Sequence, residues 1–74
     1  MEPTMDYVVV IEPAPDGSFS AYVPDLPGCV SCGDTLEEAR TLISEAINLH
    51  IESLRNHGEP VPRPSVMTHR VHAA

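Results

Sequence analysis

The sequence predicts a single small α+β domain with the element order β-β-β-α-β, spanning residues 1–74. Two observations carry this prediction. A Val-rich apolar run and an alternating segment, separated by turn residues, open the chain, and one long stretch of helically spaced apolar residues follows. A chain of 74 residues buries only a modest core. We therefore expect oligomerisation or a partner protein to add to its stability.

The first two predicted strands form a hairpin. Residues 5–12 contain five consecutive apolar residues, Tyr7 to Ile11, and three of them are Val. A run without alternation is typical of a strand that is buried on both faces, at the centre of a sheet. Pro13 to Gly17 supplies the turn. Residues 18–23 then alternate between apolar and polar, which predicts a strand with one drier face.

The next segment joins the hairpin to the helix. Pro24 to Gly28 holds two prolines and a glycine, and this composition predicts a rigid loop. A short third strand, Cys29 to Cys32, follows and ends at Gly33.

The helix is the best-marked element of the chain. Thr35 and Glu38 match a capping box, which predicts a helix from about Leu36 to residue 56 or 57. Gly58 is the expected residue just beyond its end. The apolar residues that recur at helical spacing form one stripe: Leu36, Ala39, Ile43, Ala46, Ile47, His50 and Leu54.

The end of the chain predicts a fourth strand at the edge of the sheet. Residues 59–65 hold three prolines and form an extended connector, and residues 66–72 alternate weakly. A right-handed crossover through the helix places the last strand parallel to the first. The predicted sheet order is then 3-2-1-4, mainly antiparallel, with the first strand central.

This architecture leaves one apolar face without cover. A single helix covers one face of the sheet, whereas the first strand is apolar on both. A second copy or a partner protein is expected on the other face, so we predict a homodimer or a higher even oligomer. The residues that we expect on this oligomer surface are Val8, Val10, Leu42 and Leu49.

The charge balance narrows the class of partner. Four Arg and no Lys stand against eleven Asp and Glu, which gives a formal net charge of −7. Direct binding of nucleic acid needs a basic cluster that this chain lacks, whereas an acidic surface favours a basic protein. The chain shows no signal peptide, and its longest apolar run is too short to span a membrane. A cytoplasmic protein with reduced thiols is expected.

Several segments, taken in order, resemble the HicB-like antitoxins of toxin–antitoxin systems. The resemblance covers residues 5 to about 65 and is carried by the following segments: Asp16-Gly17 with Tyr22-Val23, Pro24 to Cys29, Gly33 to Ala39, the helix end with His50, Leu54 and Gly58, and Pro62-Arg63-Pro64.

The resemblance implies a fold and a function. The fold is a cut-down ribonuclease-H-like β-β-β-α-β unit. The function is the neutralisation of a small basic HicA-like toxin, an mRNA-cleaving RNase, by covering its active surface. Many members of the family also carry a C-terminal DNA-binding domain, for which a chain ending at Ala74 has no room, and this departure leaves autoregulation by DNA binding an open question. The alternative is a standalone homo-oligomeric regulatory or ligand-binding module without a cognate toxin.

The sequence does not predict an enzyme. Ribonuclease-H-type catalysis needs clustered carboxylates that hold two metal ions. The middle of the first strand is apolar, and Asp6 and Glu12 lie only at its ends.

A zinc site is the most specific alternative that the sequence offers. Cys29 and Cys32 with His69 and His72 supply four possible ligands. Residues three apart on a regular strand point to opposite faces, so each pair would need a bulge. We therefore expect no metal and no cofactor, and we expect Cys29 to be a buried thiol.

Three further polar residues have structural interpretations that we favour over functional ones. His50 lies in the apolar stripe and is expected to be a core histidine rather than a pH sensor, and His57 suits the helix C-terminus. Asp25 is either a toxin contact or the acceptor of a hydrogen bond within its own turn, and we favour the turn.

Overall fold

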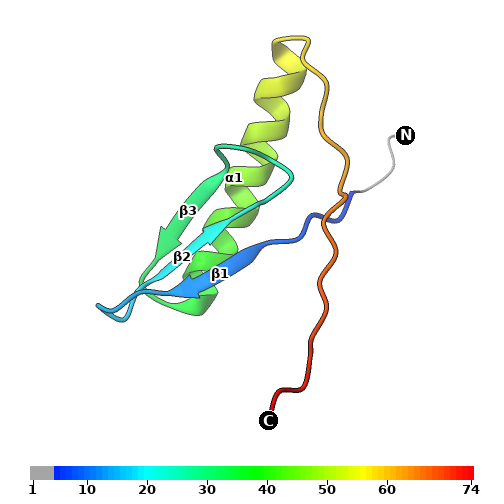
Figure 1. Ribbon diagram of the computed structural model, residues 1–74. Helices are drawn as coiled ribbons and strands as arrows, with labels where there is room; N and C mark the ends of the chain where they lie inside the picture. Colours follow the sequence, from blue (N-terminus) through cyan, green and yellow to red (C-terminus); the bar gives the residue numbers. More distant parts are fainter. Residues whose placement is uncertain (1–4) are drawn as a thin grey trace.

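The computed structural model describes residues 5–74 and consists of three strands and one helix. The three strands form one antiparallel sheet in the order β1-β2-β3, and the helix crosses one of its faces (Figure 1). The elements are β1 (Val10–Pro13), β2 (Phe19–Tyr22), β3 (Val30–Gly33) and α1 (Leu36–Asn56).

The predicted fourth strand is wrong. Residues 66–72 form no strand, so the order 3-2-1-4 is not observed and β1 is an edge strand rather than the central one. The segment leaves the body of the molecule as an extended arm (Figure 1). The backbone N–H groups of Ser65 and Val66 bond to the Asp25 side chain instead of to β1, which directs the chain away from the sheet.

The paired part of the first strand is shorter than predicted and lies later in the chain. Its register with β2 runs from Val10, opposite Tyr22, to Pro13, opposite Phe19. Because β2 ends at Tyr22, where the chain turns into the next loop, the apolar residues 7–9 have no strand beside them. They form an extended lead-in to β1.

The turn between β1 and β2 forms as its composition predicts. The Ala14 N–H donates to the Ser18 carbonyl at 2.8 Å, and Gly17 adopts a positive φ of 88°. The Asp16 carboxylate accepts hydrogen bonds from the backbone N–H and the hydroxyl of Ser18. The dry face of β2 and the residue that follows it is confirmed, because Ala21 and Val23 are both buried.

The centre of the core is a loop residue. Leu26 has no exposed surface, although it lies in the Pro-rich loop between β2 and β3. Its N–H donates to the Val23 carbonyl, and its carbonyl accepts from the Cys29 N–H, both at 3.0 Å. These bonds fold the loop back so that Leu26 packs against the sheet and the helix. The buried cluster contains Ala21, Val23, Leu26, Cys29 and Ile43, with Tyr7, Val9, Ile11, Ala46 and Ile47 half-buried around it.

Both ends of α1 are capped by the residues that predicted them. The Thr35 hydroxyl accepts from the Glu38 N–H at 3.0 Å, while the Glu38 carboxylate accepts from the Asp34 N–H, one residue earlier than a standard capping box. At the other end, Gly58 has a φ of 68°, and its N–H donates to the Arg55 carbonyl. The next residue donates to the Leu54 carbonyl, which completes a Schellman motif.

The apolar stripe of α1 is buried mainly in its first half. Ala39 and Ile43 are buried, whereas Leu36 in the first turn is 42% exposed. The later members of the stripe are half-buried: Ala46, Ile47, His50 and Leu54. Within residues 5–74, no helix has the length and apolar character needed to cross a membrane.

Gly33 sets the distance between the sheet and the helix. A Cβ atom added to Gly33 would lie 2.7 Å from the backbone nitrogen of Ala39 and 3.0 Å from the backbone carbon of Glu38. These neighbours are main-chain atoms of the first helical turns and cannot rotate away. The absence of a side chain at position 33 therefore lets α1 lie against β3.

Gly33→Ala is expected to lower the free energy of unfolding by about 1–3 kcal/mol, because the added methyl group must push the helix off the sheet. Urea unfolding followed by circular dichroism measures the change. Ser20→Ala, at an exposed position of β2, is the control and should leave the midpoint unchanged. A wild-type midpoint for Gly33→Ala would contradict the close approach.

Thr35→Ala is expected to cost about 0.5–2 kcal/mol of stability across the whole domain, because it leaves the Glu38 N–H without its acceptor at the start of the only helix that the structure describes. The same urea experiment on the single variant and on the Asp34→Ala/Thr35→Ala double variant tests whether Asp34 takes over the cap. Wild-type midpoints for both would mean that the helix start does not limit stability.

Candidate partner-binding site

One row of apolar side chains crosses the face of the sheet that α1 does not cover. Val10, Tyr22 and Val30 are cross-strand neighbours in register. Ile11 and Ala21, one position along, pack into the core, so alternation turns this row to the opposite face. Tyr22 is 39% exposed and Val30 is 66% exposed. We call Val10, Tyr22 and Val30 the outer row.

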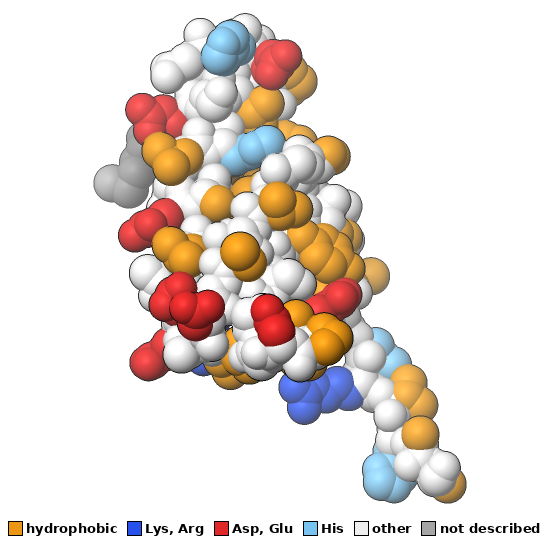
Figure 2. All heavy atoms as spheres, turned by 90° about the vertical axis from the view of Figure 1, so that its left-hand side faces the viewer, with side chains coloured by type: hydrophobic (Ala, Val, Ile, Leu, Met, Phe, Trp, Pro, Cys, Tyr) orange, Lys and Arg blue, Asp and Glu red, His pale blue; other side chains and the backbone are white. Residues whose placement is uncertain are grey.

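Charge is divided unevenly between the body and the C-terminal segment. All eleven acidic residues lie within residues 1–59, with two of the four Arg, which gives this part a net charge of −9. Residues 60–74 contain Arg63, Arg70, His69 and His72 and no acid, which gives +2 with His neutral. Figure 2 shows acidic side chains spread over the body, and hydrophobic and His side chains along the projecting segment. The body therefore offers a negative surface to a partner.

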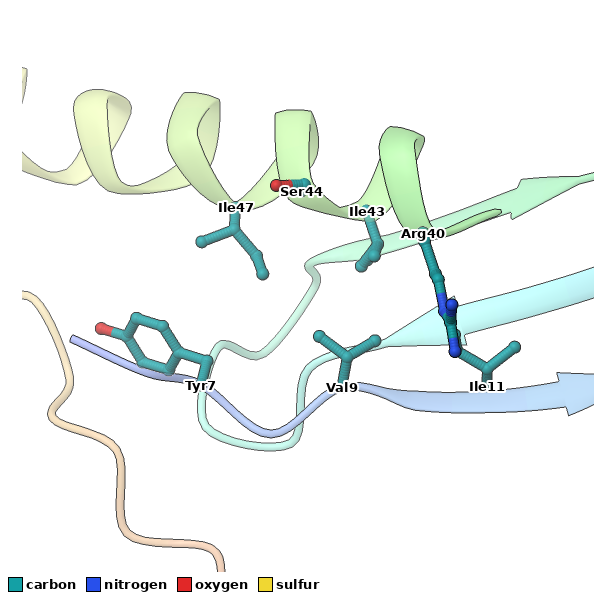
Figure 3. A pocket seen from close by; sticks show the side chains of 7 residues that line it. All are labelled: Tyr7, Val9, Ile11, Arg40, Ile43, Ser44 and Ile47. Atoms are coloured by element: carbon teal, nitrogen blue, oxygen red, sulfur yellow. The ribbon is translucent and has the colours of Figure 1, made fainter. Parts of the chain in front are cut away.

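A cleft of about 480 Å³ lies between α1 and the free edge of β1. In Figure 3, Ile43 and Ile47 point into it from the helix, Tyr7 and Val9 from the opposite wall, and the Arg40 side chain reaches across toward β1. Ile11 and Ser44 complete the lining. The lining side chains are apolar apart from Arg40, Ser44 and the hydroxyl of Tyr7, and the cleft is partly open to solvent. Its shape and chemistry suit an extended peptide with apolar side chains.

Asp25 anchors the C-terminal segment to the loop between β2 and β3. Its carboxylate accepts hydrogen bonds from the Ser65 N–H at 3.0 Å, the Ser65 hydroxyl at 2.8 Å and the Val66 N–H at 3.1 Å. The same three bonds lower the pKa of Asp25, the bond from the Ser65 N–H most of all. The predicted bond within the loop's own turn is therefore wrong, since the partners lie about forty residues away in sequence.

Tyr7 forms a second contact between the lead-in to β1 and this segment. Its hydroxyl donates a hydrogen bond to the Pro62 carbonyl. Burial raises the pKa of Tyr7, the charge of Asp25 raises it further, and Arg55 opposes the shift. The base of the C-terminal segment is thus fixed at two points, beside the lead-in strand.

A family model matches almost this whole sheet-and-helix unit. The match to the HicB-like antitoxins of bacterial toxin–antitoxin systems runs over residues 7–74. The chain belongs to the HicB-like antitoxin family. Membership supports an antitoxin role.

Named relatives agree with this assignment. The chain is 45% identical to UPF0150 protein Ta0767 of Thermoplasma acidophilum over 93% of its own length and all of the relative. It is 47% identical to UPF0150 protein ssr1765 of Synechocystis over 84% of its length and 78% of the relative. Antitoxin HicB 1 of Photorhabdus laumondii is 33% identical over 81% of this chain and 39% of that protein.

The four residues predicted to form an oligomer surface do not share one surface in this family member. Val10 belongs to the outer row, and Val8 precedes it in the lead-in strand. Leu42 and Leu49 lie on α1, on the other side of the sheet, where Leu42 is half-buried and Leu49 exposed. Of the outer row, Val10 was predicted from the sequence, whereas Tyr22 and Val30 were not. Their alternating positions in adjacent strands were the signal that could have identified them.

The two cysteines lie in opposite environments. Cys29 is buried and Cys32 is exposed, and burial raises the pKa of the Cys29 thiol. The prediction of a buried thiol at Cys29 is confirmed. Across residues 5–74, no three His, Cys, Asp or Glu side chains come together as a metal-binding group, so the Cys29, Cys32, His69 and His72 hypothesis gains no support.

The histidines of the helix occupy structural positions. His50 is half-buried on the core-facing side of α1. His57 follows the last helical residue, and its Nδ1 donates to the Ser53 carbonyl at 2.7 Å, which confirms its predicted place at the helix C-terminus.

The anchor of the C-terminal segment is expected to weaken in acid. Because the folded-state pKa of Asp25 lies below its ordinary value of 3.8, ionised Asp25 stabilises the anchored state above that pH, and this contribution is lost as pH falls through the folded pKa. Amide NMR shifts of Ser65 and Val66, followed from pH 7 downward, should change toward those of Asp25→Asn, whose own shifts stay constant.

Asp16→Asn is the matched control for this titration, since Asp16 also has a lowered pKa but bonds only to Ser18. It should leave the Ser65 and Val66 shifts and their pH dependence as in the wild type. If neither the fall in pH nor Asp25→Asn changed the amide shifts of Ser65 and Val66, the proposed anchor would be contradicted.

Proposed function

We propose that this protein is an antitoxin that binds a small, basic, HicA-like mRNA-cleaving toxin in the cytoplasm and occludes the toxin's active surface. Family membership supports the antitoxin role. The observation that carries the proposed mode of binding is the outer row, Val10, Tyr22 and Val30, which lies on the sheet face opposite α1 and belongs to a strongly acidic body.

The chemistry of an RNase explains why such a surface neutralises it. A protein that binds RNA presents cations to the phosphates, and it loses that site when an acidic protein occupies the same cations. The acidic body also raises the rate of encounter with a basic partner, as long-range attraction does in other complexes. The apolar outer row then supplies the desolvated contact that holds the complex together.

The proposed mechanism needs no chemistry from this chain. It is steric and electrostatic, so the antitoxin acts stoichiometrically and without a metal or cofactor. As part of the same proposal, the sheet and helix are a cut-down ribonuclease-H-like unit that serves as a binding scaffold.

Val30→Arg tests the outer row directly. The position is 66% exposed, so the fold tolerates the change, but the new cation lies where a basic toxin must approach. We expect toxin affinity, measured by isothermal titration calorimetry with a purified HicA-type toxin, to fall by about tenfold or more. Rescue of growth in cells that express the toxin should fall with it.

Leu49→Arg is the matched control, because Leu49 is also 66% exposed and receives the same charge on the helix side. It should change toxin affinity by no more than about twofold. Full toxin binding by Val30→Arg, with loss in Leu49→Arg, would place the toxin on the helix and overturn the proposed surface.

A further inference from the structure

We infer that the C-terminal arm, residues 66–72, of one copy of this chain adds as a strand to the free edge of β1 in a second copy and packs its apolar side chains into the cleft beside α1. Self-association of this kind does not depend on the proposed toxin.

The edge of β1 is open to an added strand. β1 pairs with β2 on one side only, and residues 7–9 continue it in extended form without a paired neighbour. An edge of this kind carries unpaired backbone N–H and C=O groups and pairs readily with another chain. In this molecule it is also bordered by the apolar cleft, so a strand that adds here gains side-chain burial as well as backbone hydrogen bonds.

The arm has the length and the side-chain pattern that this site requires. Seven extended residues span about 23 Å, and residues 66–72 and 7–13 are both seven residues long. Met67 is 91% exposed and Val71 is 77% exposed, and four residues of separation place both on the same side of a strand. That side suits the cleft walls formed by Ile43 and Ile47.

Charge favours the same placement. The arm carries Arg70 and no acid, whereas Asp6 and Glu12 flank the β1 edge within an acidic body. Arg70 lies on the side of the arm opposite Met67 and Val71, and Glu12 lies on the side of β1 opposite the core residue Ile11. A strand that turns its apolar side to the cleft therefore turns its cation to the face that carries Glu12.

The anchor at Asp25 directs the arm to another molecule rather than back to its own β1. Ser65 and Val66 are held by three hydrogen bonds, and the arm leaves the body from there (Figure 1). Residues 66–72 contain no Gly, Pro, Asn or Asp that would favour a reversal. The extended arm therefore reaches the edge of a second copy, and reciprocal exchange of two arms closes a symmetric dimer.

Met67→Asp/Val71→Asp in the full chain tests the arm. Burial of two apolar side chains at the interface is lost and two charges enter an apolar cleft, so the dissociation constant of the dimer, measured by sedimentation equilibrium, should rise by about 100-fold or more. Thr68→Asn/His72→Asn is the control: it changes two side chains with the same spacing on the other side of the arm, adds no carboxylate to the face that carries Glu12, and should retain most of the dimer. A monomeric wild type at micromolar concentration, or a dimer that survives Met67→Asp/Val71→Asp, would overturn the inference.

Amide hydrogen exchange distinguishes between two cases: an arm that is donated by another copy, and an arm that folds back onto its own chain. Protection of the N–H groups of residues 7–13 should rise with protein concentration over the range in which the dimer forms, and it should be lost in Met67→Asp/Val71→Asp. Protection that is independent of concentration would mean that each chain closes its own edge, and the exchange would be refuted. Because this experiment uses the purified protein without a toxin, a negative result would refute the arm exchange and would not bear on the proposed toxin-binding surface.

Discussion

The approach of α1 to β3 at Gly33 is the constraint on which the rest of the molecule depends. The helix can cover the sheet only because position 33 has no side chain between β3 and the Ala39 backbone. That distance lets Ile43 reach the cluster around Leu26, and Leu26 in turn holds the Pro-rich loop in its folded form. The loop then presents Asp25 to the C-terminal segment. The close packing of two main-chain segments at Gly33 thus determines, through the buried side chain of Leu26, where the arm leaves the body.

The helix was predictable from sequence because each of its signals is local. The capping residue Thr35, the terminating Gly58 and the apolar spacing between them all act within a few residues, and the observed bounds match the prediction. The hairpin turn at Gly17 was predictable for the same reason. The sheet order was not, because it depends on whether residues 66–72 find an edge, which no local pattern decides.

The features that carry the candidate site are long-range, and two of them could not be predicted from the sequence. Leu26 was placed in a rigid loop and not in the core, since nothing local shows that the loop folds back over the sheet. Asp25 bonds to residues about forty positions away. The outer row arises from the register of three strands, which brings Tyr22 and Val30 beside the Val10 that the sequence did identify. The overall charge of −7 likewise hides a division between an acidic body and a basic end.

The small core has a consequence for how long the protein persists in a cell. Six apolar side chains are buried within residues 5–74, and a core of this size supplies no more than about 3–5 kcal/mol. Proteases act on the unfolded fraction, which is therefore larger here than for an average domain. A partner present at 100 times its dissociation constant adds about 2.7 kcal/mol and reduces that fraction about 100-fold. Because a bound partner lowers the unfolded fraction, we expect chains in complex with a partner to outlive chains without one.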